Sequence, residues 1–139
     1  MATNRFIGNA PLVAQLNTVT PAVVVATNTF TLTCNSKTIT VVSVAGTVAE
    51  ICTLMAAAVT ASLIPEFQEV TATDNVTALL LTSRVPGQPF TITSSASGGS
   101  ATFVTTLTTA NSGPNDLNVA SNWSLGAVPV ITDDVVLEF

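Results

Sequence analysis

Apolar and polar residues alternate along much of the chain with the period of two that is typical of β-strands. Phe30, Leu32 and Cys34 alternate with threonines, and residues 37–44 continue the alternation after the turn signal Asn35-Ser36. These two segments are therefore predicted to form a β-hairpin. Strand-like patterns resume beyond residue 65 in four further segments, which are residues 69–74, 78–83, 90–94 and 101–108.

One stretch between these strands follows the helical period instead. Thr47 and Glu50 have the spacing of a capping box, in which the Thr47 hydroxyl accepts from the N–H of Glu50 and the Glu50 carboxylate accepts from the N–H of Thr47. Pro65 is expected to end the helix, with Ile64 outside the α region. An amphipathic helix is thus predicted over about residues 47–63. Its apolar face consists of Val48, Ile51, Cys52, Met55, Val59 and Leu63.

The order of these elements favours a mainly β (α+β) fold, with an antiparallel sheet or small sandwich and one helix against it. Pro11 and Pro21 punctuate the start of the chain, and proline blocks both helix and interior strand. The composition changes again near Gly113-Pro114. We therefore expect an extended N-terminal arm (residues 1–21), a β-rich domain with one helix (residues 22–110) and a C-terminal strand extension (residues 111–139).

Charged side chains are scarce, and this limits the chemistry that the chain can perform. Its 139 residues include 3 basic and 8 acidic side chains and no histidine. Three scattered cations cannot neutralise a run of phosphates, so no nucleic-acid partner is predicted. Histidine is the usual general base and the commonest metal ligand, and no Cys or carboxylate cluster has metal-ligand spacing. We therefore predict that the protein is not an enzyme and holds no cofactor.

The same composition bears on membranes and on association. No apolar run approaches the ~18 residues of a transmembrane helix, and the start of the chain lacks the pattern of a signal peptide, so neither a membrane partner nor export is predicted. The mean hydropathy is nevertheless +0.60. A surface of threonine, serine and asparagine has little charge to oppose association. We interpret it as a surface covered by other subunits; the alternative is a monomeric, threonine-rich β-domain.

Some polar positions leave two interpretations open. Cys34 and Cys52 both belong to faces that point into the core, where they either pack as reduced thiols or form a disulfide. Asp133-Asp134 is either a turn or part of a metal site, although the calcium-loop pattern is absent. The glycosylation sequons at Asn75 and Asn122 are attributed to chance.

The arm and the extension hold the candidate interface residues. An apolar pair beside a basic residue near a chain end suggests docking, either on the chain's own domain or on a neighbour. Trp123 is the only tryptophan, and it is either a local core plug or an anchor at a subunit contact, where tryptophan is enriched. The interface candidates are Arg5, Phe6, Ile7, Trp123, Val135 and Phe139.

Two stretches resemble known structural proteins. Residues 29–109 contain Thr29-Phe30-Thr31-Leu32-Thr33, Ile64-Pro65-Glu66-Phe67 and Pro86-Gly87-Gln88-Pro89-Phe90. With the opening Asn4-Arg5-Phe6-Ile7-Gly8-Asn9-Ala10-Pro11, they resemble a module recurrent in tailed-phage and prophage structural proteins. The stretch from Gly113-Pro114-Asn115-Asp116-Leu117 through Asn122-Trp123-Ser124 to Asp133-Asp134-Val135-Val136 is similar to the segment that leads into β-solenoids of phage appendages and bacterial surface proteins.

The resemblance implies a non-enzymatic structural subunit of a phage particle, on the head surface or associated with the tail, which acts by self-assembly and by docking to neighbouring subunits. Its partners would be copies of itself and other virion proteins, with no small-molecule substrate. It would be made in the bacterial cytoplasm and reside in the virion. The alternative is a subunit of a bacterial surface filament or adhesin, located at the cell surface. A carbohydrate-binding module is disfavoured, because the chain has one tryptophan and no tyrosine to present on one face.

Overall fold

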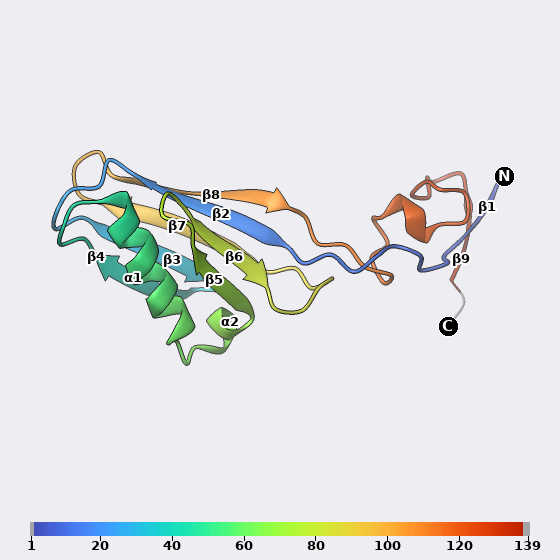
Figure 1. Cartoon of the computed structure of the whole chain (residues 1–139). Coiled ribbons are helices and arrows are strands. Elements are labelled where there is room, and N and C mark those ends of the chain that lie inside the picture. Colours follow the sequence, from blue (N-terminus) through green and yellow to red (C-terminus); the bar gives the residue numbers. More distant parts are fainter. Residues whose placement is uncertain (1, 138–139) are drawn as a thin grey trace.

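Two antiparallel sheets and one long helix form the main part of the protein, which we call the body (Figure 1). The computed structural model describes residues 2–137, and over that range it confirms the mainly β fold with one amphipathic helix. One sheet has the strand order β5-β6-β2-β8 and the other has the order β4-β3-β7. Their strands are β2 (Leu16–Ala22), β3 (Thr29–Cys34), β4 (Lys37–Val42), β5 (Val70–Asp74), β6 (Leu79–Ser83), β7 (Ile92–Ser97) and β8 (Thr102–Thr109).

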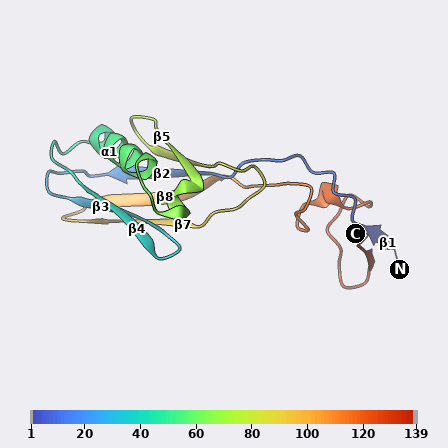
Figure 2. The same cartoon turned by 90° about the horizontal axis from the view of Figure 1, so that it is seen from below.

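Helix α1 (Val48–Thr60) covers the inner faces of both sheets. Its residues Ile51, Met55 and Val59 are buried, as the helical spacing predicts. The helix contacts β4 and β5, which are outer strands of the two different sheets (Figure 2). A single core therefore joins the sheets. It also includes Val19, Phe30, Leu32, Phe67, Val70, Leu79, Leu81, Phe90, Ile92 and Phe103.

Side-chain hydroxyls join the two sheets where β7 and β8 lie side by side. The hydroxyl of Ser94 donates to the carbonyl oxygen of Phe103 at 2.6 Å. Thr105 in turn donates its hydroxyl to Ser94 Oγ at 2.7 Å. The rings of Phe30 and Phe103 meet edge to face just inside, with their centroids 5.5 Å apart. The body is therefore one packed unit, although its strands form two separate hydrogen-bonded sheets.

Of the two hydrogen bonds predicted for the helix cap, the one accepted by the Thr47 hydroxyl is confirmed and the one accepted by the Glu50 carboxylate is wrong. Thr47 Oγ1 accepts from the Glu50 N–H at 3.2 Å. The Glu50 carboxylate does not return to Thr47, because it accepts from the backbone N–H groups of Val44 and Ala45 at 2.8 and 2.9 Å. Gly46 has a φ of +72°, which turns the preceding loop back toward the carboxylate. Glu50 thus holds the loop between β4 and α1 rather than closing a capping box.

The helix also ends earlier than the prediction of residue 63. It stops at Thr60, so Leu63 lies beyond the apolar face and is 87% exposed. Ile64 leaves the α region as expected, with φ −75° and ψ 120°. Pro65 then starts the short helix α2 (Pro65–Gln68), because proline is well tolerated in the first turn of a helix.

Residues 16–21 lie in a strand, whereas the sequence prediction places them in the N-terminal arm. They form most of β2, which pairs with β6 on one side and β8 on the other. Pro21 argued against an interior strand, but the ladder with β6 stops at Val19. At Pro21 the strand therefore has a neighbour on the β8 side alone, where a residue without an N–H is tolerated.

Both cysteines are buried and free, so the structure has the reduced alternative. Burial raises the pKa of Cys52 to about 11, with a further contribution from the Asp74 carboxylate. Burial also raises the pKa of Cys34, and the charges of Glu69 and Glu66 add to the effect. Since the thiolate is the reactive form, both thiols are chemically protected in the fold.

We therefore predict that neither thiol reacts with an aromatic disulfide reagent at pH 8 while the protein is folded. Both should react rapidly in denaturant, and absorbance of the released thiolate measures the number titrated. Fast reaction of either cysteine without denaturant would contradict the burial described above.

A second prediction concerns the Glu50 carboxylate. Hydrogen bonds from the loop N–H groups, first that of Ala45, lower the pKa of Glu50 from its ordinary 4.5. A depressed folded pKa contributes stability above the unfolded pKa, and this contribution is lost as pH falls through the folded pKa. Glu50→Gln should therefore be less stable than the wild type at pH 7, with the difference shrinking below pH 4.5.

Urea denaturation followed by circular dichroism at pH 7 and pH 3 measures this difference. Glu69→Gln is the matched control, since it removes one carboxylate without touching the loop between β4 and α1. A difference between Glu50→Gln and the wild type that stays constant across pH would show that the carboxylate charge plays no part.

Candidate interaction surface at the chain ends

The two ends of the chain fold together into a terminal lobe, which we define as residues 2–13 and 111–137. Strand β1 (Thr3–Arg5) pairs in parallel with β9 (Asp134–Val136), and a short 3₁₀-helix (Ala120–Asn122) lies between them in sequence. In Figure 1 the lobe stands at one end of an elongated molecule, joined to the body by extended segments. The start of the chain therefore docks on its own chain, one of the two sites that the sequence left open.

An aromatic contact closes the lobe. The rings of Phe6 and Trp123 meet edge to face with centroids 5.3 Å apart and an interplanar angle of 72°. The Trp123 indole N–H donates to the carbonyl oxygen of Leu117 at 2.9 Å, so its polar atom is satisfied although the residue is only 4% exposed. Trp123 is thus the core plug of the lobe within this chain.

Two buried asparagines hold the lobe together, and Asn122 makes the larger set of contacts. Its Nδ2 donates to the carbonyl oxygens of Gly113 and Asp116, both at 2.8 Å, while its Oδ1 accepts from the Ala10 N–H. Its own carbonyl oxygen accepts from the Ile7 N–H at 2.7 Å. With 0% exposure, the side chain has no free amide for glycosylation. Asn122 thus ties the segment from Ile7 to Ala10 to the segment from Gly113 to Asp116.

Asn4 makes a similar connection at the far end of the lobe. Its Nδ2 donates to the carbonyl oxygen of Ala127 at 2.9 Å, and its Oδ1 accepts from the Leu125 N–H at 3.2 Å. A buried amide without partners would cost ~1–3 kcal/mol, so these bonds fix the loop around residue 125. The sequence analysis gave neither asparagine a structural role, because buried polar residues that bind several distant backbone groups follow no periodic pattern.

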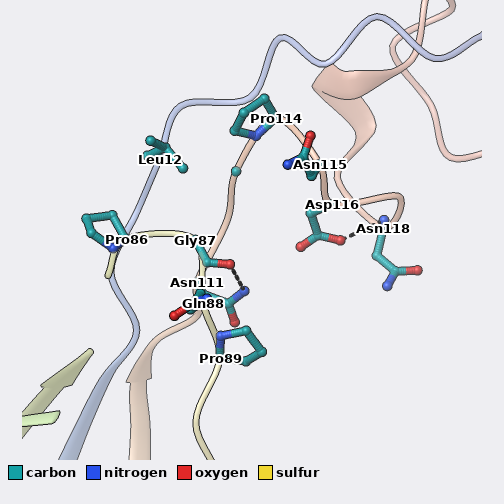
Figure 3. A pocket seen from close by; sticks show the side chains of 11 residues that line it. Leu12, Pro86, Gly87, Gln88, Pro89, Asn111, Pro114, Asn115, Asp116 and Asn118 are labelled. Atoms are coloured by element: carbon teal, nitrogen blue, oxygen red, sulfur yellow. Dashed lines mark hydrogen bonds between the residues drawn. The ribbon is translucent and has the colours of Figure 1, made fainter. Parts of the chain in front are cut away.

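The lobe meets the body at a narrow neck that contains a groove of about 500 Å³. Val13 and Ser112 exchange backbone hydrogen bonds there, and the Gly87 N–H donates to the Val13 carbonyl oxygen at 3.0 Å. Figure 3 shows Leu12 and Pro86 on one side of the groove, with Pro114 and Asp116 across from them. The lining offers amides, prolines and a single carboxylate. It lacks the facing pair of carboxylates that glycoside hydrolysis requires.

The outer surface of the lobe is strongly apolar. Ile131 is fully exposed at 102%, and Val130 is 61% exposed. The charged residues of the described lobe are Arg5 and three aspartates, so the apolar groups are only lightly interrupted. The other exposed apolar residues of the lobe are Ile7, Leu12, Leu117, Leu125, Val128, Val135 and Leu137. A small lobe with so many exposed apolar side chains and so few charges is a candidate interaction surface.

The structure brings five of the six interface candidates together in this lobe. Arg5 lies in β1 and exchanges hydrogen bonds with Ser124, while Val135 lies in β9 opposite Asn4. Phe6 and Trp123 point inward and form the lobe core. Ile7 and Val135 remain on the surface at 54% and 49% exposure. The sixth candidate, Phe139, lies outside the described residues.

No protein-family model matches the chain, and no curated protein matches it. Within residues 2–137, no group of three or more histidine, cysteine or acidic side chains is arranged to hold a metal ion. None of the helices in this range is long and apolar enough to cross a membrane.

A third prediction tests the role of Asn122. Asn122→Asp removes two donated hydrogen bonds and turns a carboxylate oxygen toward the carbonyls of Gly113 and Asp116. This should destabilise the lobe by at least ~3 kcal/mol. Because Trp123 is the only tryptophan, its emission in a denaturant titration reports the unfolding of the lobe.

Asn118→Asp is the matched control, since it introduces the same charge on an exposed residue of the same segment. Equal midpoints for the two variants would show that the hydrogen bonds of the Asn122 side chain do not hold the lobe.

Proposed function

We propose that this protein is a non-enzymatic structural subunit of a phage particle, which acts by self-assembly and by docking to neighbouring subunits. The observation that carries the proposal is the terminal lobe, a small folded unit with most of its large apolar side chains exposed. Trp123 and Ala10 are its buried hydrophobic residues, whereas Val130, Ile131 and Leu125 face solvent. A lobe held by backbone pairing and buried amides can present such side chains without losing its shape.

The distribution of charge supports association. Net charge keeps proteins soluble and apart, and this chain has a formal charge of −5 carried by only 11 ionisable acidic and basic residues. The described part of the lobe holds few of these charges, namely Arg5, Asp116, Asp133 and Asp134. Few charges therefore oppose the approach of a second subunit to its apolar surface.

The far end of the body is apolar as well. Val23, Val25 and Val44 are 59%, 58% and 78% exposed on the loops opposite the lobe. Asn28 fixes these loops, because its side chain accepts from the Val25 N–H and donates to the Gly98 carbonyl oxygen. The elongated subunit therefore has an ordered apolar surface at each end, which suits a building block that contacts neighbours along its length.

A fourth prediction tests the lobe as the assembling surface. The purified wild-type chain should have a mass in solution several times its 14.2 kDa, measured by light scattering over a range of concentrations. Ile131→Asp should lower that mass strongly, since it replaces the most exposed apolar side chain of the described residues by a charge. The circular dichroism spectrum should not change, because Ile131 is fully exposed.

Leu63→Asp is the matched control, because Leu63 is also an exposed apolar residue, at 87%, and lies on the body beyond the end of α1. A wild-type chain of 14.2 kDa at every concentration, or equal masses for both variants, would overturn the role of the lobe. Labelling of purified phage particles with an antibody to the chain then tests the virion location. Labelling of intact bacterial cells instead would favour the surface filament or adhesin.

A further inference from the structure

Strand β4 is an outer strand of its sheet and leaves one backbone edge open. It pairs with β3 alone, from Lys37 opposite Cys34 to Val42 opposite Thr29, with no bulge (Figure 2). Asn35 and Ser36 both have positive φ, as in the two-residue type I′ turns that place the closing pair within hydrogen-bonding distance. The backbone N–H and C=O groups of Lys37, Ile39 and Val41 therefore point toward β3. Thr38, Thr40 and Val42 turn theirs to the open edge, and all three are exposed.

This edge lacks the features that usually prevent strand addition. It has six residues, no proline and no bulge, and its one charge lies at its first residue, Lys37. The four-stranded sheet has the outer strands β5 and β8, of which β8 lies beside β7, so β5 is the strand to compare. Arg84 Nε donates to the carbonyl oxygen of Val70 in β5 at 3.1 Å, and β5 ends in the charged Asp74. The open edge of β4 is thus the better of the two for backbone pairing.

We infer that a second copy of this chain pairs with this edge, β4 against β4 in antiparallel orientation about a two-fold axis. Side-chain alternation restricts the register, because directly opposed residues point to the same face. Ile39 and Val41 face the core under α1, so they must oppose residues of the same set. Placing the axis at Thr40 sets Thr40 opposite Thr40 and Ile39 opposite Val41 of the second copy.

Charge complementarity and the length of the paired segment select this register among those that alternation permits. With the axis at Thr40, Lys37 lies opposite Ser43 of the second copy on the α1 side of the sheet. Ser43 Oγ donates to Glu50 Oε2 at 2.9 Å, so the Lys37 ammonium comes beside the Glu50 carboxylate. The two-fold axis makes this contact twice. An axis at Ile39 would instead oppose Lys37 with Val41, away from the carboxylate. An axis at Val41 would pair only residues 40–42 of β4 with each other, whereas the axis at Thr40 pairs residues 38–42.

The resulting interface is isologous and closed, because the same edge serves both copies. It joins the two three-stranded sheets into one and leaves both terminal lobes free for further contacts. The inference deepens the proposed self-assembly and rests on it only in naming a second copy as the partner. It involves none of the lobe residues, so the two surfaces are tested separately.

A fifth prediction is a site-specific disulfide. In Thr40→Cys, the two Cα atoms at the axis lie ~5.5 Å apart, which is within disulfide range. Mild oxidation should convert most of this variant into a covalent dimer on a non-reducing gel. Thr38→Cys is the matched control, because Thr38 opposes Val42 and the two copies of residue 38 lie ~13 Å apart. The wild-type chain reports any contribution from Cys34 and Cys52, which are buried.

Lys37→Glu tests the charge argument, since it places two carboxylates together at each end of the interface. Measured with Ile131→Asp in the background to remove lobe contacts, it should raise the dimer dissociation constant at least ~tenfold. Thr40→Pro is a second test of the β4 interface, because the Thr40 N–H points to the open edge and makes no hydrogen bond with β3. Adding Thr40→Pro to the Ile131→Asp protein should halve its mass in solution.

The outcomes separate the two proposals. A wild-type assembly that retains its mass in Thr40→Pro and gives no Thr40→Cys crosslink overturns the β4 interface and leaves the self-assembly standing. A crosslinked dimer that forms no larger assembly supports the β4 interface and counts against the proposed structural role. Equal crosslinking of Thr38→Cys and Thr40→Cys overturns the register.

Discussion

The packing of α1 across two sheets is the contact on which the rest of the protein depends. Ile51, Met55 and Val59 fill the space between β4 and β5, strands that share no hydrogen bonds with each other. Removing this helix face would leave the two outer strands without a common partner. The helix also contacts β2, which pairs with β8, and from these two strands the chain continues into the terminal lobe. The geometry of both proposed surfaces therefore derives from one apolar core.

The lobe is stabilised by a different kind of interaction. It has too little chain to enclose an apolar core, and its buried groups are mostly an indole and two amides. Asn4 and Asn122 replace hydrophobic contacts by hydrogen bonds that only one arrangement of the backbone satisfies. Such an arrangement is specific, but it leaves valine, leucine and isoleucine side chains on the outside. The small number of residues in the lobe thus explains both why hydrogen bonds hold it together and why its apolar side chains lie on the outside.

The sequence predicted those features that depend on local period and failed on those that depend on distant partners. Alternation located the hairpin of β3 and β4, and helical spacing identified the buried face of α1. The assignment of residues 16–21 to the N-terminal arm was wrong, because whether a strand tolerates Pro21 depends on its neighbouring strands, which no local pattern reveals. The hydrogen-bond partners of Glu50 likewise depend on the path of the loop before the helix. The pairing of β1 with β9 joins residues from opposite ends of the chain, for which no local pattern exists.

The parallel pairing of β1 with β9 has a mechanical consequence. The first residue of β1 lies beside the first residue of β9, so the flanking chain leaves the pair at opposite ends, before Thr3 and after Val136. Tension applied at residues 2 and 137 pulls along the strand axis and loads the bonds from Asp134 N–H to Ala2 and from Phe6 N–H to Val136 simultaneously. In this shear geometry the bonds must break together rather than one after another. A subunit pulled by its two ends would thus resist force first at its smallest sheet, shielding the body from the load.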